Sequence, residues 1–147
     1  MTRAHREVHL VARPEAIPQA EHFALREATT PEPAEGQIQI RVTHVSVDPA
    51  MRGWVSAVGN YSEPVALDAP MRSIAVGDVI ASRSARYAEG DVLCGMFGWR
   101  EVATVDESAV WFRHDPAHGP RTLALGALGI NGMTAYWALR DVGRPRA

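Results

Sequence analysis

Apolar and polar residues alternate in several short segments between residues 8 and 105. Two runs near the N-terminus, VHLVA and HFALREATT, each end at prolines, and the clearest run, EGQIQIRVTHVSVD, places Ile38, Ile40 and Val42 on one face of a strand. Three more short runs follow in 71–105, punctuated by Gly-Asp pairs that suit turns and bulges. Closely spaced short strands with repeated turn signals predict a mainly β fold, a small and partly open β-barrel over residues 1–120.

The pattern changes over residues 121–147, where RTLALGALGINGMTAYWALRDVG has apolar residues at helical spacing. We expect a first helix to end near Gly126 or Gly129, and a second to run from Asn131 or Gly132 to about Val142. Glycine recurs at every third position from 126 to 132, but no G-x-G-x-x-G occurs. The spacing therefore predicts close backbone packing between two helices and not a phosphate cradle.

Composition limits the functions that this chain can have. Its 147 residues are 46% hydrophobic and 22% charged, which fits one globular domain with or without part of another. The net charge of -2 argues against nucleic acid. All fifteen basic residues are arginine, which excludes a Schiff-base or P-loop lysine. We see no signal-peptide core and no run approaching the ~18 apolar residues that cross a membrane, so we expect a cytoplasmic location.

The strand that carries His44, Ser46 and Asp48 has a spacing that imitates a catalytic triad. Residues two apart on a strand lie ~6.6 Å apart along it, whereas a triad needs hydrogen-bond contacts between different elements. We therefore expect Ser46 and Asp48 to bond backbone groups where the strand ends.

Metal or thiol chemistry has little support. His114 and His118 have i, i+4 spacing, but the intervening Asp115-Pro116 opposes a helix and favours a polar surface loop. Cys94 is the single cysteine, which excludes an internal disulfide and a four-cysteine zinc lobe, and its apolar strand predicts an inert core thiol. We predict no metal site.

The segment VSVDPAMRGW is expected to stop the clearest strand abruptly. Pro49 fixes φ and lacks an N–H group, so strand pairing ends there and the following residues emerge at the rim of the barrel. Apolar and aromatic groups at a rim form a pocket wall more often than a core, so Met51 and Trp54 are candidate pocket residues. Tyr61 and Trp99 are further candidates, whereas we expect Phe97 to lie in the core.

Three segments, VSVDPAMRGW, YAEGDVLCGMFGWREVATV and LGALGINGMTAYWALRDVGRPRA, together resemble the zinc-independent medium-chain dehydrogenases/reductases. The branch is that of prostaglandin, plant alkenal double-bond and bacterial curcumin reductases, and the likeness runs from about Val8 onward. It implies a GroES-like substrate barrel in residues 1–120. Residues 121–147 would be a helical segment leading to a Rossmann domain that is absent from this chain.

The resemblance also implies an activity and a set of site residues. Family members bind NADP(H), reduce the C=C bond of α,β-unsaturated aldehydes and ketones by hydride transfer, and lack zinc. The segment matching Asp48–Gly53 walls their substrate and nicotinamide site. Pro49, Ala50 and Thr134 are thus the predicted cofactor-binding residues, and the predicted substrate-binding residues are Ala50, Met51, Tyr61 and Trp99. Many members carry Tyr where this chain has Ala50, which implies a wider pocket here, and no catalytic proton donor is identified.

Several consequences follow for the chain alone. The resemblance covers roughly the first half of such an enzyme, so we expect weak NADPH binding, no measurable reduction, and either self-association or pairing with a chain that holds the cofactor domain. A small-molecule enone or enal is the expected substrate, with no nucleic-acid or membrane partner. Two alternatives stay open: a stand-alone GroES-like binding or interaction module without catalysis, and a quinone reductase of the same superfamily.

Overall fold

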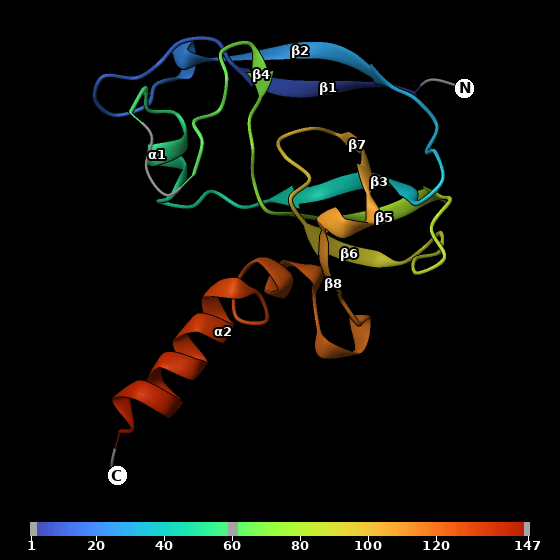
Figure 1. Cartoon of the computed structure of the whole chain (residues 1–147), viewed down its shortest axis with the longest axis vertical. Helices are drawn as coiled ribbons and strands as arrows, with labels where there is room; N and C mark the ends of the chain where they lie inside the picture. The colour runs from blue at the N-terminus through green and yellow to red at the C-terminus, as the bar shows by residue number, and fades with distance from the viewer. Residues whose placement is uncertain (1–2, 59–61, 146–147) are drawn as a thin grey trace.

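The computed structural model describes residues 3–58 and 62–145, which form two β-sheets and a helical segment that extends away from them (Figure 1). The three-stranded sheet has the order β2-β1-β4, and the five-stranded sheet has the order β7-β3-β5-β6-β8. All pairs are antiparallel. The mainly β fold is confirmed, and it is partly open because the two sheets do not close into one continuous barrel.

The strands agree with the alternating runs of the sequence in most places. Two short strands, β4 and β8, were not predicted, because neither shows a clear alternation of its own. The smaller sheet contains β1 (Arg3–Leu10), β2 (Phe23–Thr30) and β4 (Ala69–Pro70). The larger sheet contains β3 (Gln37–Val45), β5 (Ala75–Ser82), β6 (Val92–Gly95), β7 (Val102–Asp106) and β8 (Val110–Arg113).

The core is divided between the two sheets. Ile38, Ile40 and Phe97 are almost fully buried and pack together inside the larger sheet, which confirms Phe97 as a core residue. Leu10 of β1 packs with Trp54 in a second cluster beneath the smaller sheet. Burying large aliphatic and aromatic side chains contributes about 1.5–3 kcal/mol each, so these two clusters account for much of the stability of the fold.

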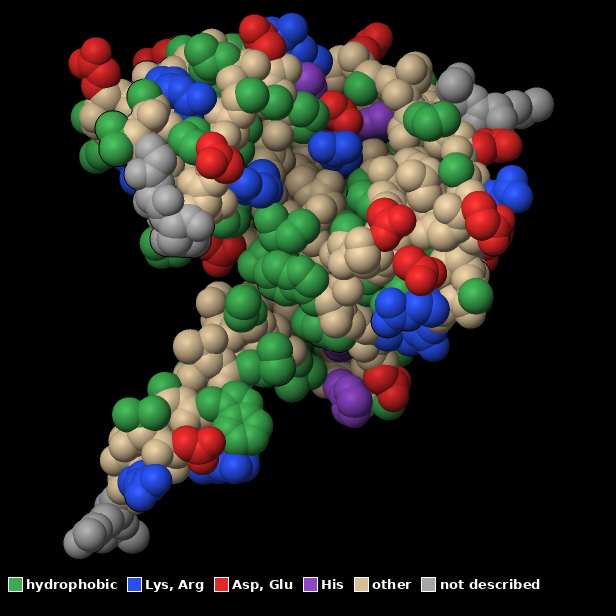
Figure 2. Space-filling view, viewed as in Figure 1, with side chains coloured by type: hydrophobic (Ala, Val, Ile, Leu, Met, Phe, Trp, Pro, Cys, Tyr) green, Lys and Arg blue, Asp and Glu red, His purple; other side chains and the backbone are tan. Residues whose placement is uncertain are grey.

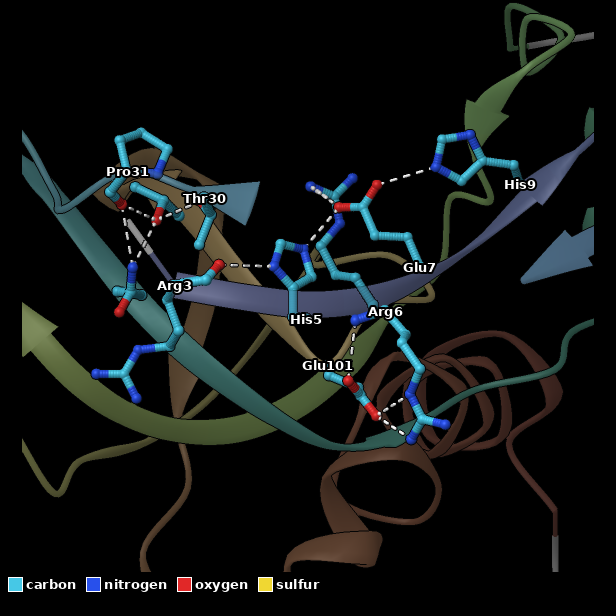
Figure 3. A network of polar contacts seen from close by, with 11 residues as sticks. Arg3, His5, Arg6, Glu7, His9, Thr30, Pro31 and Glu101 are labelled. Carbon is cyan, nitrogen blue, oxygen red and sulfur yellow. Dashed lines mark hydrogen bonds and ion pairs between the residues drawn. The ribbon is translucent and has the colours of Figure 1, made fainter. Parts of the chain in front are cut away.

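A buried polar network lies on β1, where the two sheets meet (Figure 3). The Glu7 carboxylate accepts hydrogen bonds from His5 Nε2 and His9 Nε2, each at 3.0 Å, and Arg100 Nη1 lies 3.6 Å away. Burial alone would raise the pKa of Glu7, but the His5 bond, the Arg100 charge and the His9 bond outweigh it and lower that pKa. A backbone β-bridge also pairs Glu7 with Arg100, so main-chain and side-chain contacts both tie β1 to the segment just before β7.

The C-terminal segment differs in detail from the predicted pair of helices. The first element is a 3₁₀ helix, η4 (Arg121–Leu125), and three shorter ones occur earlier, η1 (Ala20–His22), η2 (Glu107–Ala109) and η3 (Pro116–His118). The second element begins as α2 (Ile130–Trp137) and continues as a π-helix, η5 (Ala138–Gly143). Arg144, with φ 41°, follows in the left-handed conformation that ends helices.

Close backbone packing before α2 explains two of the three spaced glycines. A Cβ added to Gly132 would lie 1.9 Å from the Ala127 carbonyl oxygen, and one added to Gly129 would lie 2.2 Å from that of Ala124. No such contact exists at Gly126. The prediction of close packing is therefore confirmed at Gly129 and Gly132, which fix how α2 leaves the sheets.

The helical segment exposes much apolar surface. Met133, Trp137 and Leu139 are 50%, 48% and 60% exposed, and no residue of α2 or η5 among the described ones is buried. Figure 1 shows this segment projecting beyond the sheets to the C-terminus. No helix among residues 3–58 and 62–145 is long and apolar enough to span a membrane.

Candidate functional site

The segment after β3 turns sharply into a one-turn helix. Ser46 N–H donates to the Ile74 carbonyl at 2.8 Å, and Pro49 cannot continue the strand pairing. The Asp48 carbonyl accepts from Met51 N–H at 3.0 Å, which starts α1 (Met51–Trp54). β3 ends at Val45, so the strand stops four residues earlier than the proline in the sequence predicts, and the residues after Pro49 form a compact turn at the edge of the fold.

The side chains of Ser46 and Asp48 interact differently from the expectation. Ser46 Oγ donates to the Asp48 carboxylate, whereas we expected both side chains to bond backbone groups. The His44 ring contacts the hydroxyl of Thr43 at 3.1 Å and is not hydrogen-bonded to Ser46. No triad geometry forms among these residues.

A groove of about 540 Å³ separates the α1 region from the start of α2. We call it the 48–134 groove, and its walls come from five places in the chain that the fold brings together. Figure 2 shows apolar side chains gathered on the face from which the helical segment leaves the sheets. The groove is lined by Asp48, Pro49, Ala50, Trp54, Ile74, Met96, Trp111, Ile130, Asn131 and Thr134.

The walls of the 48–134 groove are mostly apolar, and several of its polar groups are already bonded. Asp48 is paired with Ser46, and Thr134 Oγ1 donates to the Ile130 carbonyl at 2.7 Å. Because that bond uses the Thr134 proton, its hydroxyl oxygen can only accept a further hydrogen bond. An apolar cleft with a few convergent polar groups is the usual form of a small-molecule site.

Trp54 serves both the groove and the core. Its side chain is 8% exposed, and the guanidinium of Arg72 stacks over its ring at 4.5 Å from the centroid. The indole Nε1 is enclosed and has no acceptor in the described part of the chain. Trp54 is thus held in place by packing and by the cation on its face.

The predicted site residues divide into two groups. Pro49, Ala50 and Thr134 all line the 48–134 groove, although they lie far apart in the sequence. Met51 is 6% exposed and packs in the core cluster with Leu10, so it lies behind the wall of the groove. Tyr61 lies outside the described residues.

Trp99 lies against the smaller sheet. Its ring contacts Phe23, with centroids 5.8 Å apart, and it lines a separate shallow groove with Val8, Leu25 and Val47. The structure does not bring Trp99 to the 48–134 groove, and its role in substrate binding stays a prediction.

Five groove residues were not predicted as site residues, namely Ile74, Met96, Trp111, Ile130 and Asn131. Trp111 is 43% exposed on β8, a strand that was not predicted. Ile74 and Met96 stand immediately outside β5 and β6, at strand ends. Position in the chain could have indicated Ile74 and Met96, because apolar residues next to strand ends lie at the same edge of the fold as the Pro49 turn.

The two histidines of the i, i+4 pair lie in different surroundings. His114 is buried, and its ring nitrogen contacts the Gly119 carbonyl at 3.0 Å, so the expected surface loop is wrong for this residue. His118 is exposed at the end of η3, as expected. Within 3–58 and 62–145, no group of three metal-ligating side chains occurs.

Cys94 is buried between β6 and η4, where its Sγ lies 3.6 Å from the Ala124 carbonyl oxygen. Burial raises the pKa of this thiol to about 11. We expect its reaction with a disulfide reagent at mildly alkaline pH to be at least about 100-fold slower in the native chain than in denaturant, because the thiolate is scarce. Equal rates in the two conditions, followed by absorbance of the released thiol, would contradict an inert core thiol.

Comparison with known proteins identifies the class to which this fold belongs. Residues 6–112 match the family described as the N-terminal domain of oxidoreductase. The chain belongs to this family, and the match covers most of it. The sequence resemblance to the curcumin, alkenal and prostaglandin reductases is confirmed by similar proteins of those names.

Two relatives and one solved structure show the extent of the likeness. A putative NADP-dependent oxidoreductase of Bacillus subtilis, YfmJ, is 36% identical over 99% of this chain and 42% of its own length. The NADPH-dependent curcumin reductase of Escherichia coli is 35% identical over 93% of this chain and 39% of its own length. The crystal structure of CurA in complex with NADPH from Vibrio vulnificus superposes with a TM-score of 0.85, at 37% identity, over 96% of this chain and 42% of that one. The chain therefore spans about two-fifths of these proteins.

Proposed function

We propose that residues 1–147 form the substrate-side part of an NADPH-dependent reductase that acts, without zinc, on the C=C bond of α,β-unsaturated aldehydes and ketones. The observation that carries the proposal is the apolar 48–134 groove, built from the Asp48–Ala50 turn and the start of α2. Relatives named as NADPH-dependent curcumin reductase and 2-alkenal reductase, 35% and 29% identical, support this substrate class.

The groove offers a suitable environment for a conjugated carbonyl compound. Ala50, Ile74 and Met96 present apolar surface and exclude water, which favours a neutral, mostly apolar ligand. The small side chain of Ala50 leaves space beside Trp54, so the pocket accepts a bulky group there. The 48–134 groove would thus hold the substrate between the α1 turn and Trp111.

The residues present fit the nicotinamide end of NADP(H). Pro49 offers an apolar wall, and the Thr134 oxygen can accept a hydrogen bond from a carboxamide N–H group. When bound, the cofactor supplies a hydride to the β carbon of the substrate. A glycine-rich phosphate turn is not found in the sequence of residues 1–147, so the rest of the dinucleotide would be held by residues outside them.

We also propose a division into a barrel, residues 1–120, and a junction segment, residues 121–147. The exposed apolar residues of α2 and η5, among them Met133 and Leu139, favour a partner surface on this segment. In the whole protein that surface would be the cofactor domain. For the chain alone we expect self-association, and a concentration-independent monomer in light scattering would contradict it.

The proposed function is tested by a chimera. Residues 1–142 are joined to the corresponding C-terminal part of the Escherichia coli curcumin reductase, and consumption of NADPH is followed with an enone, an enal and a quinone. We expect reduction of the enone or enal by the chimera, whereas the 147-residue chain alone shows neither activity nor micromolar NADPH affinity. A folded chimera that reduces only the quinone, or nothing, would contradict the proposal, and so would micromolar NADPH binding by the chain alone.

A further inference from the structure

The 48–134 groove contains few side-chain hydrogen-bond donors, and most of them cannot reach a ligand. Asp48 carries no proton to donate when ionised, and its carboxylate is paired with Ser46. Thr134 has donated its proton to the Ile130 carbonyl. Trp54 Nε1 is enclosed with no accessible surface, so a ligand in the groove does not contact it.

Two side-chain donors of the groove are left. The Asn131 amide lies in the first turn of α2, is exposed, and makes no hydrogen bond within the described residues. The Trp111 indole N–H stands on β8 on another wall and is likewise unbonded there. An amide offers two N–H donors on a short side chain, whereas the indole offers one on a ring that is 43% exposed to water.

We propose that the Asn131 side chain is the group that binds the carbonyl oxygen of the ligand in the 48–134 groove. A carbonyl oxygen is an acceptor only, so it complements the Asn131 amide and is unfavourable against the apolar surface of Ala50 or Met96. The ligand is oriented with its oxygen toward the start of α2 and its apolar part toward α1.

This inference rests on the proposed function and adds a chemical role to it. Addition of a hydride to the β carbon breaks the C=C π bond. The π electron pair shifts toward the carbonyl group, and the substrate becomes an enolate with negative charge on the carbonyl oxygen. A proton from solvent or from a group outside residues 1–147 then binds the α carbon. A hydrogen bond donated to this oxygen becomes stronger as the charge develops, so Asn131 would stabilise the transition state more than the bound substrate.

The test compares two ligands of the same shape. Benzylideneacetone carries the carbonyl oxygen, and its methylene analogue carries a CH₂ group in that place. Their affinities for the 147-residue chain are measured by NMR titration. We expect the ketone to bind about two- to tenfold more tightly than the analogue, the range that one net hydrogen bond provides.

Three variants locate the donor. Asn131→Leu removes the amide, and Asn131→Asp keeps its shape but replaces the donors with an acceptor. Both are expected to abolish the preference for the ketone, and the aspartate variant is expected to reverse it. Trp111→Phe keeps an aromatic wall but removes the indole N–H, and it is expected to leave the preference unchanged.

The outcomes separate the inference from the proposed function. Suppose that the wild-type protein prefers the ketone. If both Asn131 variants keep the same preference, or if the Trp111→Phe variant loses it, the assignment to Asn131 is wrong while the groove remains a ligand site. If it binds both ligands equally well, the carbonyl has no donor partner and the inference is also wrong. If it binds neither ligand, the proposed function fails together with the inference.

Discussion

Replacing Trp54 with alanine is expected to lower the free energy of unfolding by about 3–5 kcal/mol and to abolish ligand binding in the 48–134 groove. The side chain is 8% exposed and packs with Leu10, Val55 and Met71 while its ring forms one wall of the groove. Its removal leaves a cavity and frees the guanidinium that stacks on it. Urea unfolding measures the first effect, and titration with benzylideneacetone measures the second.

Trp137→Ala is the matched control for this variant. Trp137 is 48% exposed on α2 and does not line the groove, so its replacement is expected to change stability by less than about 1 kcal/mol and to leave binding unchanged. A Trp54→Ala variant as stable as Trp137→Ala would mean that Trp54 is not a core residue. A Trp54→Ala variant that binds the ketone normally would mean that Trp54 is not a wall of the site.

The second large effect is expected for Glu7→Gln. The Glu7 side chain is 10% exposed and is the carboxylate shared by His5, His9 and Arg100. Removing its charge leaves the Arg100 guanidinium without this buried carboxylate and disturbs the hydrogen bonds to both histidines, and breaking such a buried network costs about 3 kcal/mol. We expect the loss at neutral pH, measured by denaturant unfolding.

The pH dependence of this contribution has a defined sign. Because the pKa of Glu7 is lowered in the native state, the folded protein binds fewer protons at this group than the unfolded chain does. The stabilisation is therefore present above the pKa of an unfolded glutamate and is lost as the pH falls through the lowered native value. Wild-type protein should lose stability over this acid range relative to Glu7→Gln.

Glu35→Gln serves as the control, since Glu35 pairs with Arg83 at the surface and its side chain is 85% exposed. Its loss is expected to change stability by less than about 0.5 kcal/mol. A Glu7→Gln variant that resembles Glu35→Gln at every pH would mean that the buried network does not stabilise the fold.

The sequence predicted those elements whose signal lies within a few neighbouring residues. Ile38 and Ile40 alternate within one long strand, so their burial could be predicted without tertiary contacts, whereas β3 already ends at Val45, before the Pro49 that was expected to stop it. The groove residues Trp111 and Met96 lie next to strand ends, and only the sheet order brings them beside α2. Their place in the site depends on pairings that the sequence does not reveal locally.

The division between Met51 and Trp54 illustrates the same limit. Both follow Pro49 in a compact turn, and both were candidates for the rim of the pocket. One helical turn directs Met51 entirely into the core, whereas Trp54 contacts both the core and the groove. The buried carboxylate at Glu7 also went unpredicted, because its partner Arg100 lies far along the chain.

The central claim is that the α1 turn and the start of α2 form one ligand-binding groove. The most direct measurement is a map of backbone amide shifts when benzylideneacetone is added to the isotope-labelled chain. We expect the perturbed amides to cluster at Asp48, Ala50, Trp111, Asn131 and Thr134. Perturbations confined to the shallow groove at Val8, Leu25 and Trp99, or no perturbation at saturating ligand, would contradict the account.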